Sequence, residues 1–540
     1  MAENDTPSIV EHRHWVEQLG QKALDRGPGP YIVTAGMTTS GPAHMGTLCE
    51  MLYPQAIARH LNQTKHPTQY IFIADIMDAF DAVPLDMQKY TAQLAPHLGK
   101  PLCDVPDPTG AQPSFGEHYL AESFEIGKQF GIAPKLVRAQ ELYTSGAMDH
   151  YARLFIEQLP MVRELVATTS LKPELPADWA PIMPICENCG RISTTRVINI
   201  TPERYSYSCD KNVKYTQGCG HSGSNSISDH KYKLTWRLHW PAWMDFFHTS
   251  IEGGGVDHFT RGGSWDTCQA VFHNIFHKEP PIGYQFGFVL FMGKKYSKSK
   301  GIGMGVRELL SLIPASVLSY ALLRPDLNEN RDINPTAENL LRLMNEFEEA
   351  GRLAQEMGLA IGNSTSTTAS LVHQVRSPSA DISRAERKKA LAFALASPTP
   401  IWSTPFTDLL IYYGLYGDWD RVAAKLGQAQ DVMALSPYIQ TWKSKGMIPD
   451  IYNFQFKGAP AAHASVREWA QTLHPGMNAL AIHNSVFEYS KSKHIPPAQM
   501  FGEIYQDLLS KSMGPKIGRL VEILGVQRVR DALLAPPAKP

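Results

Sequence analysis

The stretch that most constrains the fold of this chain is a predicted strand, turn and helix near its start. Tyr31–Ala35 is rich in β-forming residues, Thr38–Thr47 contains glycines, and Leu48–Leu61 is an apolar run of helical length. A strand that leads through such a turn into a helix presents backbone N–H groups to a phosphate. His44, inside the turn, can donate a hydrogen bond to charge developing on that phosphate. Taken alone, the stretch is equally compatible with an ordinary βα turn that happens to contain a histidine.

A second predicted strand ends in acidic residues. Tyr70–Ala74 is almost entirely apolar, as expected for a parallel strand buried on both faces. Asp75, Asp78 and Asp81 follow it, and ligands of open α/β sheets bind outside the carboxyl ends of the strands. The acids are therefore placed to meet a ligand, although capping of a following helix is the alternative, above all for Asp81.

The remaining periodicity predicts an α/β region followed by helices. Residues 112–168 alternate helical patterns with a short strand at Leu136-Val137, which continues the α/β pattern. From Arg307 onward the apolar residues recur with a helical period, so we expect residues 340–540 to form one all-helical domain or two helical subdomains.

A segment between these regions, Pro173–His230, contains four cysteines. The first two have the CxxC spacing in which two neighbouring thiolates bind zinc, and four thiolates complete a tetrahedral structural site. His221 can replace the last cysteine as a ligand, and four unrelated free thiols are the alternative. A redox CxxC is disfavoured because no thioredoxin-like context surrounds it. The predicted metal ligands are Cys186, Cys189, Cys209 and Cys219.

Tryptophans and glycines cluster after the cysteines. Trp236, Trp240 and Trp243 are typical of core packing, but tryptophan faces also attract ammonium groups and can form the wall of a cation pocket. Glycine clusters around Asp257 and His258 let a ligand approach the backbone closely. The carboxylate of Asp257 can bind ribose hydroxyls.

A lysine-rich loop follows a third apolar run. Phe286–Met292 is predicted as a strand, and it leads into Gly293–Gly301, which carries four lysines and two serines. Such a loop is suited to a polyphosphate, whose charge it would neutralise electrostatically. A solvated charged surface is the alternative.

Composition and charge limit the partners and the compartment. The 51 basic and 52 acidic residues nearly cancel, so any RNA-binding surface must be a local patch. No signal-peptide pattern is present at the N-terminus, and no apolar run approaches the ~20 residues of a membrane span. With seven cysteines, four of them clustered, we expect a metal site in a reducing cytoplasm and no membrane association.

Together, the two loops resemble the signature pair of class I aminoacyl-tRNA synthetases, the HIGH and KMSKS motifs that flank ATP. The matches are His44-Met45-Gly46-Thr47 and Lys295-Tyr296-Ser297-Lys298-Ser299, in which Thr47 replaces the second histidine and Tyr296 the methionine. In detail, the chain is similar to class I lysyl-tRNA synthetases nearly from end to end. The supporting stretches are Gly36–Gly41, Asp75–Asp78 with Val83-Pro84, Val105–Pro108, Trp236-Arg237 with Trp240-Pro241, Asp257-His258, Lys298–Gly301, Glu503–Tyr505, Gly514–Lys516 and Gly518-Arg519.

This resemblance implies a fold and its division into domains. The fold is α/β, with a Rossmann-type parallel-sheet catalytic domain, a zinc-binding insertion and an all-α C-terminal anticodon-binding domain of the α-helix-cage type. The expected ranges are 1–172 and 233–335 for the two halves of the catalytic domain, 173–232 for the insertion, and 336–540 for the helical domain.

The resemblance also implies an activity and its residues. The chain would be a lysine–tRNA ligase that uses ATP, Mg²⁺ and a structural Zn²⁺, takes L-lysine and tRNA(Lys) as substrates, and is a monomer. The catalytic residues would be His44, Lys295 and Lys298. ATP would be bound by Gly41, His44, Gly46, Thr47, Asp257, Lys295, Ser297, Lys298 and Ser299. Lysine would be bound by Gly36, Thr38, Glu50, Asp75, Asp78, Trp236, His258 and Tyr284.

Two other readings compete with this one. Another class I synthetase, glutamyl or arginyl, is the nearer, but a glutamate pocket needs basic residues and the pocket candidates here are acidic and aromatic. The other is a non-catalytic, zinc-containing RNA-binding paralogue, which only Thr47 and Tyr296 favour.

Overall fold

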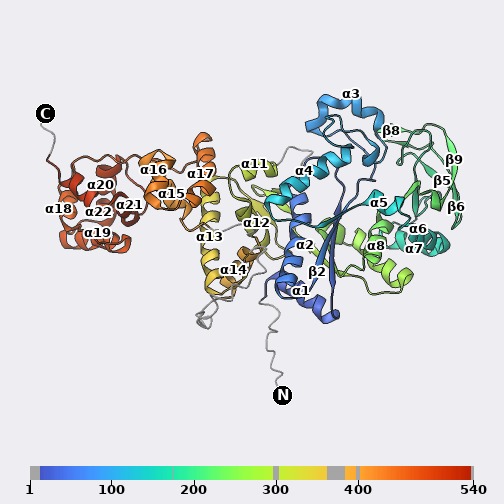
Figure 1. Cartoon of the computed structure of the whole chain (residues 1–540), viewed down its shortest axis with the longest axis horizontal. Coiled ribbons are helices and arrows are strands. Elements are labelled where there is room, and N and C mark those ends of the chain that lie inside the picture. Colours follow the sequence, from blue (N-terminus) through green and yellow to red (C-terminus); the bar gives the residue numbers. More distant parts are fainter. Residues whose placement is uncertain (1–12, 173, 296–302, 362–382, 397–401, 537–540) are drawn as a thin grey trace, which may run out of the picture. The chain divides into compact units, whose positions relative to one another are not determined.

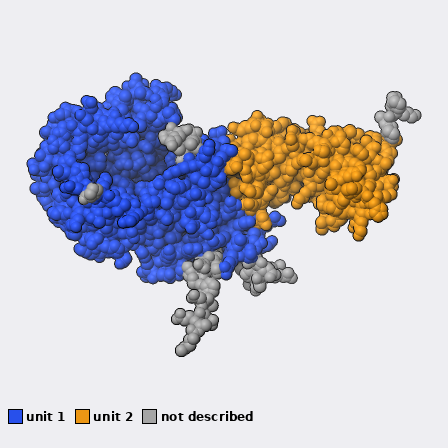
Figure 2. All heavy atoms as spheres, turned by 180° about the vertical axis from the view of Figure 1, so that it is seen from behind, with its two compact units in different colours: residues 1–308, 315–333, 350–399 blue, residues 309–314, 334–349, 400–540 orange. Residues whose placement is uncertain are grey.

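The computed structural model describes residues 13–172, 174–295, 303–361, 383–396 and 402–536 (Figure 1). It divides into two compact units, coloured separately in Figure 2. Unit 1 comprises residues 1–308, 315–333 and 350–399, and unit 2 comprises residues 309–314, 334–349 and 400–540. The domain boundaries expected from the sequence stay predictions.

Unit 1 contains a five-stranded parallel sheet in the order β12-β11-β1-β2-β3. The predicted strands at 31–35 and 70–74 are confirmed as β1 and β2, and the short strand at Leu136-Val137 as part of β3. The strand bounds are Tyr31–Met37 for β1, Thr68–Ala74 for β2, Lys135–Arg138 for β3, Ile251–Gly255 for β11 and Ile282–Phe286 for β12.

The chain winds outward from β1 in both directions. It passes from β1 to β2 and β3 on one side, and then crosses to β11 and β12 on the other. Val33 of β1 pairs with Ile251 of β11. The strand order therefore reverses between β1 and β11, and in open α/β sheets ligands bind at this switch point.

Helices cover both faces of the sheet, as a Rossmann-type fold requires. Helices α2 (Met45–Gln63) and α4 (Phe115–Gln129) lie on one side and α8 (Trp236–Phe246) on the other (Figure 1). Helix α1 (Trp15–Arg26) packs on α2, and α10 (Ser264–Val271) packs on α8. The predicted α/β architecture is confirmed.

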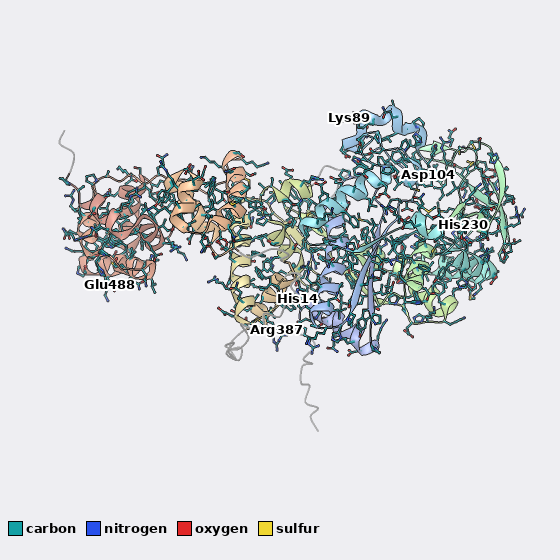
Figure 3. All side chains as sticks on the ribbon, viewed as in Figure 1. His14, Lys89, Asp104, His230, Arg387 and Glu488 are labelled. Atoms are coloured by element: carbon teal, nitrogen blue, oxygen red, sulfur yellow. The ribbon has the colours of Figure 1, made fainter. Side chains whose placement is uncertain are left out.

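The cysteine-containing segment forms small antiparallel sheets of its own. Strand β4 (Ile182–Pro184) pairs with β10 (Tyr232–Leu234), and β5 (Arg196–Ile200), β6 (Arg204–Ser208) and β9 (Ser222–Ser226) form a second sheet. Strands β7 (Asn212–Val213) and β8 (Thr216–Gln217) form a hairpin. The segment is tied to the rest of unit 1 near β10, where His230 and Tyr232 both contact Asp149, at 3.1 and 2.8 Å (Figure 3 labels His230).

The predicted strand Phe286–Met292 is wrong in its extent, because it is broken in two. Strand β12 ends at Phe286, and β13 (Val289–Phe291) belongs to another sheet with β14 (Lys294–Lys295) and β15 (Arg331–Ile333). The break lies at Gly287, whose N–H donates to Leu327 O at 2.8 Å. A Cβ at Gly287 would lie 2.5 Å from Glu329 O, so only glycine fits this crossing.

Unit 1 is completed by short helices. Those before the cysteine segment are α3 (Thr91–Leu94), α5 (Ala139–Thr144), α6 (Asp149–Glu157) and α7 (Leu159–Thr169), with 3₁₀ turns at Leu85–Tyr90, Ala95–His97 and Leu102–Asp104. Those after it are α9 (Val256–Phe259), α12 (Ala315–Leu323) and α14 (Arg384–Ala396), while α11 (Val306–Leu310) is divided between the two units.

Unit 2 is helical throughout its described residues, as predicted for the C-terminal region. Its core includes Trp469, Ile504 and Leu520, all fully buried. Gly518 lets α21 approach α19 closely, because a Cβ there would lie 1.9 Å from Ala479 O. The helices are α15 (Phe406–Tyr416), α16 (Trp419–Leu426), α17 (Ala429–Ser444), α18 (Ala464–Thr472), α19 (Ala479–Lys493), α20 (Pro497–Leu509), α21 (Ile517–Leu524) and α22 (Val526–Leu534), while α13 (Ala337–Glu356) is shared between the units. Among the described residues, none of the helices has both the length and the apolar character needed to span a bilayer.

Candidate active site

The turn between β1 and α2 is organised by His44. This residue is the N-cap of α2, and its Nδ1 accepts a hydrogen bond from the Thr47 N–H at 3.2 Å. The bond satisfies one of the N–H groups that every helix start leaves unpaired. Because Nδ1 is the acceptor, a neutral His44 ring carries its proton on Nε2 and is a donor there. The capping bond thus fixes the tautomer that a hydrogen bond to phosphate requires.

A cavity of about 350 Å³ lies at the carboxyl ends of β1 and β11, at the switch point of the sheet. The cavity brings together residues that are more than two hundred positions apart in the sequence. The predicted site residues that line it are Thr38, His44, Gly46, Thr47, Glu50, Asp257, His258 and Lys295.

A carboxylate and an ammonium group lie at one part of the cavity wall. Lys295 Nζ is 3.6 Å from Asp257 Oδ2, and both side chains are exposed. The same Nζ lies 3.8 Å from the centre of the Phe288 ring, which holds the cation by its π face. Both groups are accessible to a ligand with hydroxyls and anionic oxygens.

Glu50, on helix α2, is another predicted acid that lines the cavity. It is half-buried on α2, and its Oε1 accepts a hydrogen bond from Gly255 N–H at 3.2 Å. Burial raises the pKa of Glu50 to about 8, the nearby Glu252 adds to the rise, and the Gly255 hydrogen bond opposes it. A carboxyl with so high a pKa gains most from a cationic partner, since the cation stabilises its charged form.

Glu252, the second residue of β11, is a buried acid that was not predicted from the sequence as a site residue. Its carboxylate accepts hydrogen bonds from the Thr34 hydroxyl and, at 2.9 Å, from Trp240 Nε1. Burial raises its pKa to about 7. A glutamate inside the otherwise apolar Ile251–Gly255 stretch was the available signal, because a buried acid needs such partners.

This raised pKa predicts a pH-dependent stability. The unfolded-state pKa of a glutamate is near 4.5. The folded state therefore holds its proton more tightly, and the free energy of unfolding falls as pH rises through the window from about 4.5 to 7. In Glu252→Gln this contribution is absent. Denaturant unfolding of both proteins is measured at pH 5 and pH 8. The free energy of unfolding of the variant, taken relative to that of wild type, is expected to be about 2 kcal/mol higher at pH 8 than at pH 5. Parallel pH dependence of the two proteins would contradict this expectation.

Aromatic rings support the cavity on the α8 side. The His258 ring lies 5.9 Å from Trp236 and 5.4 Å from Trp240, centre to centre, and the two tryptophans stack at 5.3 Å. Burial lowers the pKa of His258 below its ordinary value, which favours the neutral ring. Trp236 itself is held by a hydrogen bond from its Nε1 to Ser264 Oγ at 3.0 Å. Trp236 is thus one layer behind His258.

Two predicted lysine-binding acids pair with a lysine of the chain itself. Lys233 Nζ lies 2.8 Å from Asp75 Oδ2 and also bonds Asp78 Oδ1. Neither acid lines the cavity, although Asp78 accepts a hydrogen bond from the Thr38 hydroxyl, which does. Lys233 was not found from the sequence, because a single lysine in a short strand reads as an exposed position.

The other predicted residues lie around this centre or outside the described chain. Gly36 packs against the Trp243 ring, which a Cβ would approach to 2.8 Å. Gly41 belongs to the turn but does not line the cavity, and Tyr284 lies over Gly253 and lines two other cavities. The loop residues Ser297, Lys298 and Ser299 lie outside the described residues.

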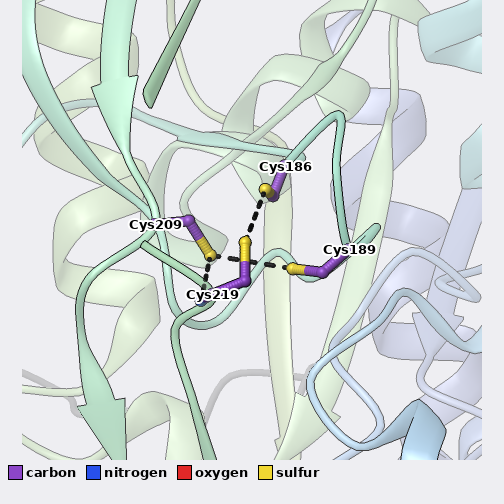
Figure 4. A group of neighbouring side chains, drawn as sticks. All are labelled: Cys186, Cys189, Cys209 and Cys219. Carbon is purple, nitrogen blue, oxygen red and sulfur yellow. Dashed lines mark hydrogen bonds between the residues drawn. The ribbon is translucent and has the colours of Figure 1, made fainter. Parts of the chain in front are cut away.

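The four clustered cysteines form a group that can hold a metal ion (Figure 4). Their Sγ atoms all lie within 4.8 Å of one another. Two pairs, Cys186 with Cys219 and Cys189 with Cys209, are separated by 3.7 Å. Thiolates 2.3 Å from a tetrahedral zinc are about 3.8 Å apart, so the spacing fits this metal. The group contains Cys219 and not His221.

The sheet, the turn and the cavity at the switch point define the class of protein. A parallel sheet in which β1 leads through a His-x-Gly turn into a helix, with a lysine loop after a later strand, is the arrangement of class I aminoacyl-tRNA synthetases. The sequence profile described as "tRNA synthetases class I (K)" matches residues 13–375, and the chain belongs to this family, the class I lysyl-tRNA synthetases.

Individual proteins are similar over most of the chain. The lysine–tRNA ligase of Archaeoglobus fulgidus is 28% identical over 97% of this chain and 99% of its own length. The lysine–tRNA ligase of Methanosarcina barkeri is 30% identical over 65% of this chain and 63% of its own. Among solved structures, a glutamate tRNA ligase from Elizabethkingia meningosepticum aligns with 93% of this chain and 98% of its own at 12% identity and a TM-score of 0.36.

Proposed function

We propose that this protein is a lysine–tRNA ligase, which joins L-lysine to tRNA(Lys) at the expense of ATP. The observation that carries the proposal is the cavity at the switch point, which combines the donor His44, the Lys295–Asp257 pair and the acid Glu50 in one place. Family membership supports the same conclusion.

The reaction has two steps. In the first, a carboxylate oxygen of lysine attacks the α-phosphorus of ATP and the bond to pyrophosphate breaks. In the second, the terminal ribose hydroxyl of the tRNA attacks the carbonyl carbon of lysyl-adenylate, and AMP leaves. Neither step needs a nucleophile from the protein, so its work is to position the reactants and stabilise charge.

The residues of the turn and of the lysine loop act on the phosphates. His44 donates from Nε2 to an oxygen of the α-phosphate, where negative charge grows in the transition state. Lys295 and Lys298 neutralise the negative charge of the leaving pyrophosphate. The hydroxyls of Ser297 and Ser299 in the same loop donate hydrogen bonds to it. Gly46 allows the backbone of the turn to approach the nucleotide, and Thr47 lines the cavity beside it. Gly41 belongs to the same turn without lining the cavity. Asp257 accepts hydrogen bonds from the ribose. Mg²⁺ bound by ATP adds positive charge at the same phosphates.

The amino acid lies between Glu50 and the aromatic wall. The side-chain ε-ammonium group of lysine is expected beside the Glu50 carboxylate, with Thr38 at the rim. His258 orients the amino acid, and Trp236 supports His258 from behind. Gly36 leaves space for Trp243 behind this wall. Asp75, Asp78 and Tyr284 act on the pocket from its surroundings, since other residues separate them from the cavity.

Loss of the Glu50 charge tests this placement. Glu50→Gln is expected to raise the KM for lysine by about 10- to 100-fold, because a charge-assisted hydrogen bond is lost, while the KM for ATP changes little. In wild type, the KM for lysine is expected to fall as pH rises from 6 to 8, since Glu50 ionises with a pKa of about 8. The variant should lose this pH dependence. An unchanged KM for lysine would place the ammonium elsewhere.

We also infer a structural zinc at the four cysteines, a monomeric protein and a cytoplasmic location. The sulfur spacings support the zinc, and a thiolate site of this kind is suited to a reducing compartment. Metal analysis of the purified protein and light scattering after size-exclusion chromatography measure the first two.

One experiment tests the proposed function against its rivals. ATP–pyrophosphate exchange is measured with each of the twenty amino acids. Exchange with lysine alone is expected. Exchange with glutamate or arginine would assign another specificity, and a second series of assays includes tRNA. No exchange in either series would indicate a non-catalytic RNA-binding protein.

A further inference from the structure

A buried lysine connects the cysteine-containing segment with the rim of the cavity. Lys233 is the central residue of β10 and is 2% exposed. Its ammonium group lies 2.8 Å from the buried Asp75 carboxylate and bonds Asp78 as well. Burial by itself lowers the pKa of Lys233, but the two carboxylates outweigh it and the pKa ends above its ordinary value. The group is therefore a permanent cation, paired as a buried charge must be.

Both acids are also hydrogen-bonded to residues that line the cavity. The second oxygen of Asp78 accepts the hydrogen bond of the Thr38 hydroxyl. The N–H of Asp75 donates to Met37 O at 2.9 Å. Met37 and Thr38 both line the cavity, at the point where β1 enters the His44 turn. Two short chains of interactions thus connect the ammonium group of Lys233 with the rim. One runs through the side chains of Asp78 and Thr38, and the other through Asp75 and its backbone bond to Met37.

Lys233 is itself held on the side away from the cavity. In the β4–β10 pair it lies opposite Met183, and Ile185 N–H, just before Cys186, donates to Lys231 O at 2.9 Å. Leu234 N–H donates to the Tyr143 hydroxyl at 2.9 Å. The strand that carries the ammonium group is therefore fixed from both sides and can serve as a rigid support.

We propose that Lys233 is a positioning residue of the amino-acid pocket: it fixes Asp78 and Asp75, and through them the place of Thr38 and Met37 at the rim. The substrate it acts on is the amino acid, because Thr38 belongs to the proposed lysine pocket, whereas the Lys295–Asp257 pair proposed for ATP lies on other elements. The expected effect of Lys233 on the KM for lysine rests on the proposed function.

The test compares variants at both ends of the network. Lys233→Met removes the charge at similar length, Lys233→Arg retains it, and Asp78→Asn interrupts the route to Thr38. The matched control is Lys231→Met, two residues away on the same segment, which removes an exposed ion pair with Glu187. The KM for lysine, the KM for ATP and kcat are measured by pyrophosphate exchange, and folding is followed by the melting temperature.

The expected result is a selective change in KM. Lys233→Met and Asp78→Asn raise the KM for lysine at least tenfold, while the KM for ATP stays within threefold of wild type. Lys233→Arg recovers part of the affinity, and Lys231→Met behaves as wild type. A folded Lys233→Met protein with an unchanged KM for lysine would overturn the proposal, and so would an equal rise in both KM values, which indicates a general structural role.

Two further measurements cover the remaining outcomes. If Lys233→Met fails to fold, Asp78→Asn is combined with Thr38→Val, and the double variant is expected to be no worse than the poorer single one. Additive losses would overturn the proposal. Amide hydrogen exchange of residues 36–44 requires no substrate, and it is expected to be faster in Lys233→Met than in wild type. Unchanged exchange would overturn the positioning role even if the wild-type protein activates no amino acid, a result that would separately reject the proposed function.

Discussion

Replacing His44 with asparagine is expected to slow lysine-dependent ATP–pyrophosphate exchange by about 100- to 1,000-fold, the usual cost of removing a donor that faces developing charge. The side-chain oxygen of asparagine can still accept the hydrogen bond from Thr47 N–H that caps α2. The variant thus loses the Nε2 donor and keeps the cap. Initial exchange rates at saturating lysine and ATP provide the measurement.

His44→Ala is the matched variant that loses both functions. It is expected to be as slow as His44→Asn and, in addition, about 1 kcal/mol less stable, because the helix cap is gone. Equal stability of the two variants would show that the capping bond contributes little. A His44→Asn rate within threefold of wild type would remove His44 from the chemistry.

The second large effect is expected at the cysteine cluster. Cys186→Ser removes one of four thiolates, and bound zinc is expected to fall from about one ion per chain to ~0.1 or less, since the free energy of zinc binding is largely folding free energy of the site. Cys186 begins the turn in which Gly190 N–H donates to Cys186 O at 2.8 Å. We therefore expect this turn to become sensitive to proteases. Elemental analysis and limited proteolysis give the two readouts.

Cys103→Ser is the control for this experiment, because Cys103 is a half-buried free thiol outside the cluster. It should leave both zinc content and protease resistance unchanged. The same zinc content in Cys186→Ser and wild type would show that the metal is bound elsewhere, and a wild-type protein without zinc would reject the assignment of the metal.

The parts of the fold that could be predicted are those whose cause is local in sequence. Strand β1, the turn and helix α2 follow one another directly, so one continuous stretch of sequence predicts all three. The CxxC spacing of Cys186 and Cys189 is local in the same sense. The pairing of the two loops came from a resemblance to class I synthetases. The chain's membership of that family is confirmed, while the pairing itself stays a prediction because residues 296–302 lie outside the described residues.

The parts that could not be predicted depend on residues brought together by the order of the strands. The role of Lys233 becomes apparent only when β10 is placed beside the end of β2. The role of Glu252 becomes apparent only when β11 is placed beside Thr34 and Trp240. The break at Gly287 is caused by Glu329 O, which no pattern around Gly287 contains. In each case a partner distant in sequence decides the role of the residue.

The position of β1 has a consequence for the order in which the chain folds during synthesis. Its two neighbours are β2, which follows soon after it, and β11, whose Ile251 pairs with Val33. At the usual rate of ~5–20 residues per second, β1 must wait roughly 10 to 40 s for that partner to be made. The four cysteines emerge from the ribosome within this interval. A growing chain could therefore bind the proposed zinc while one edge of β1 is still unpaired, and factors that cover exposed strand edges would act on this protein in that period.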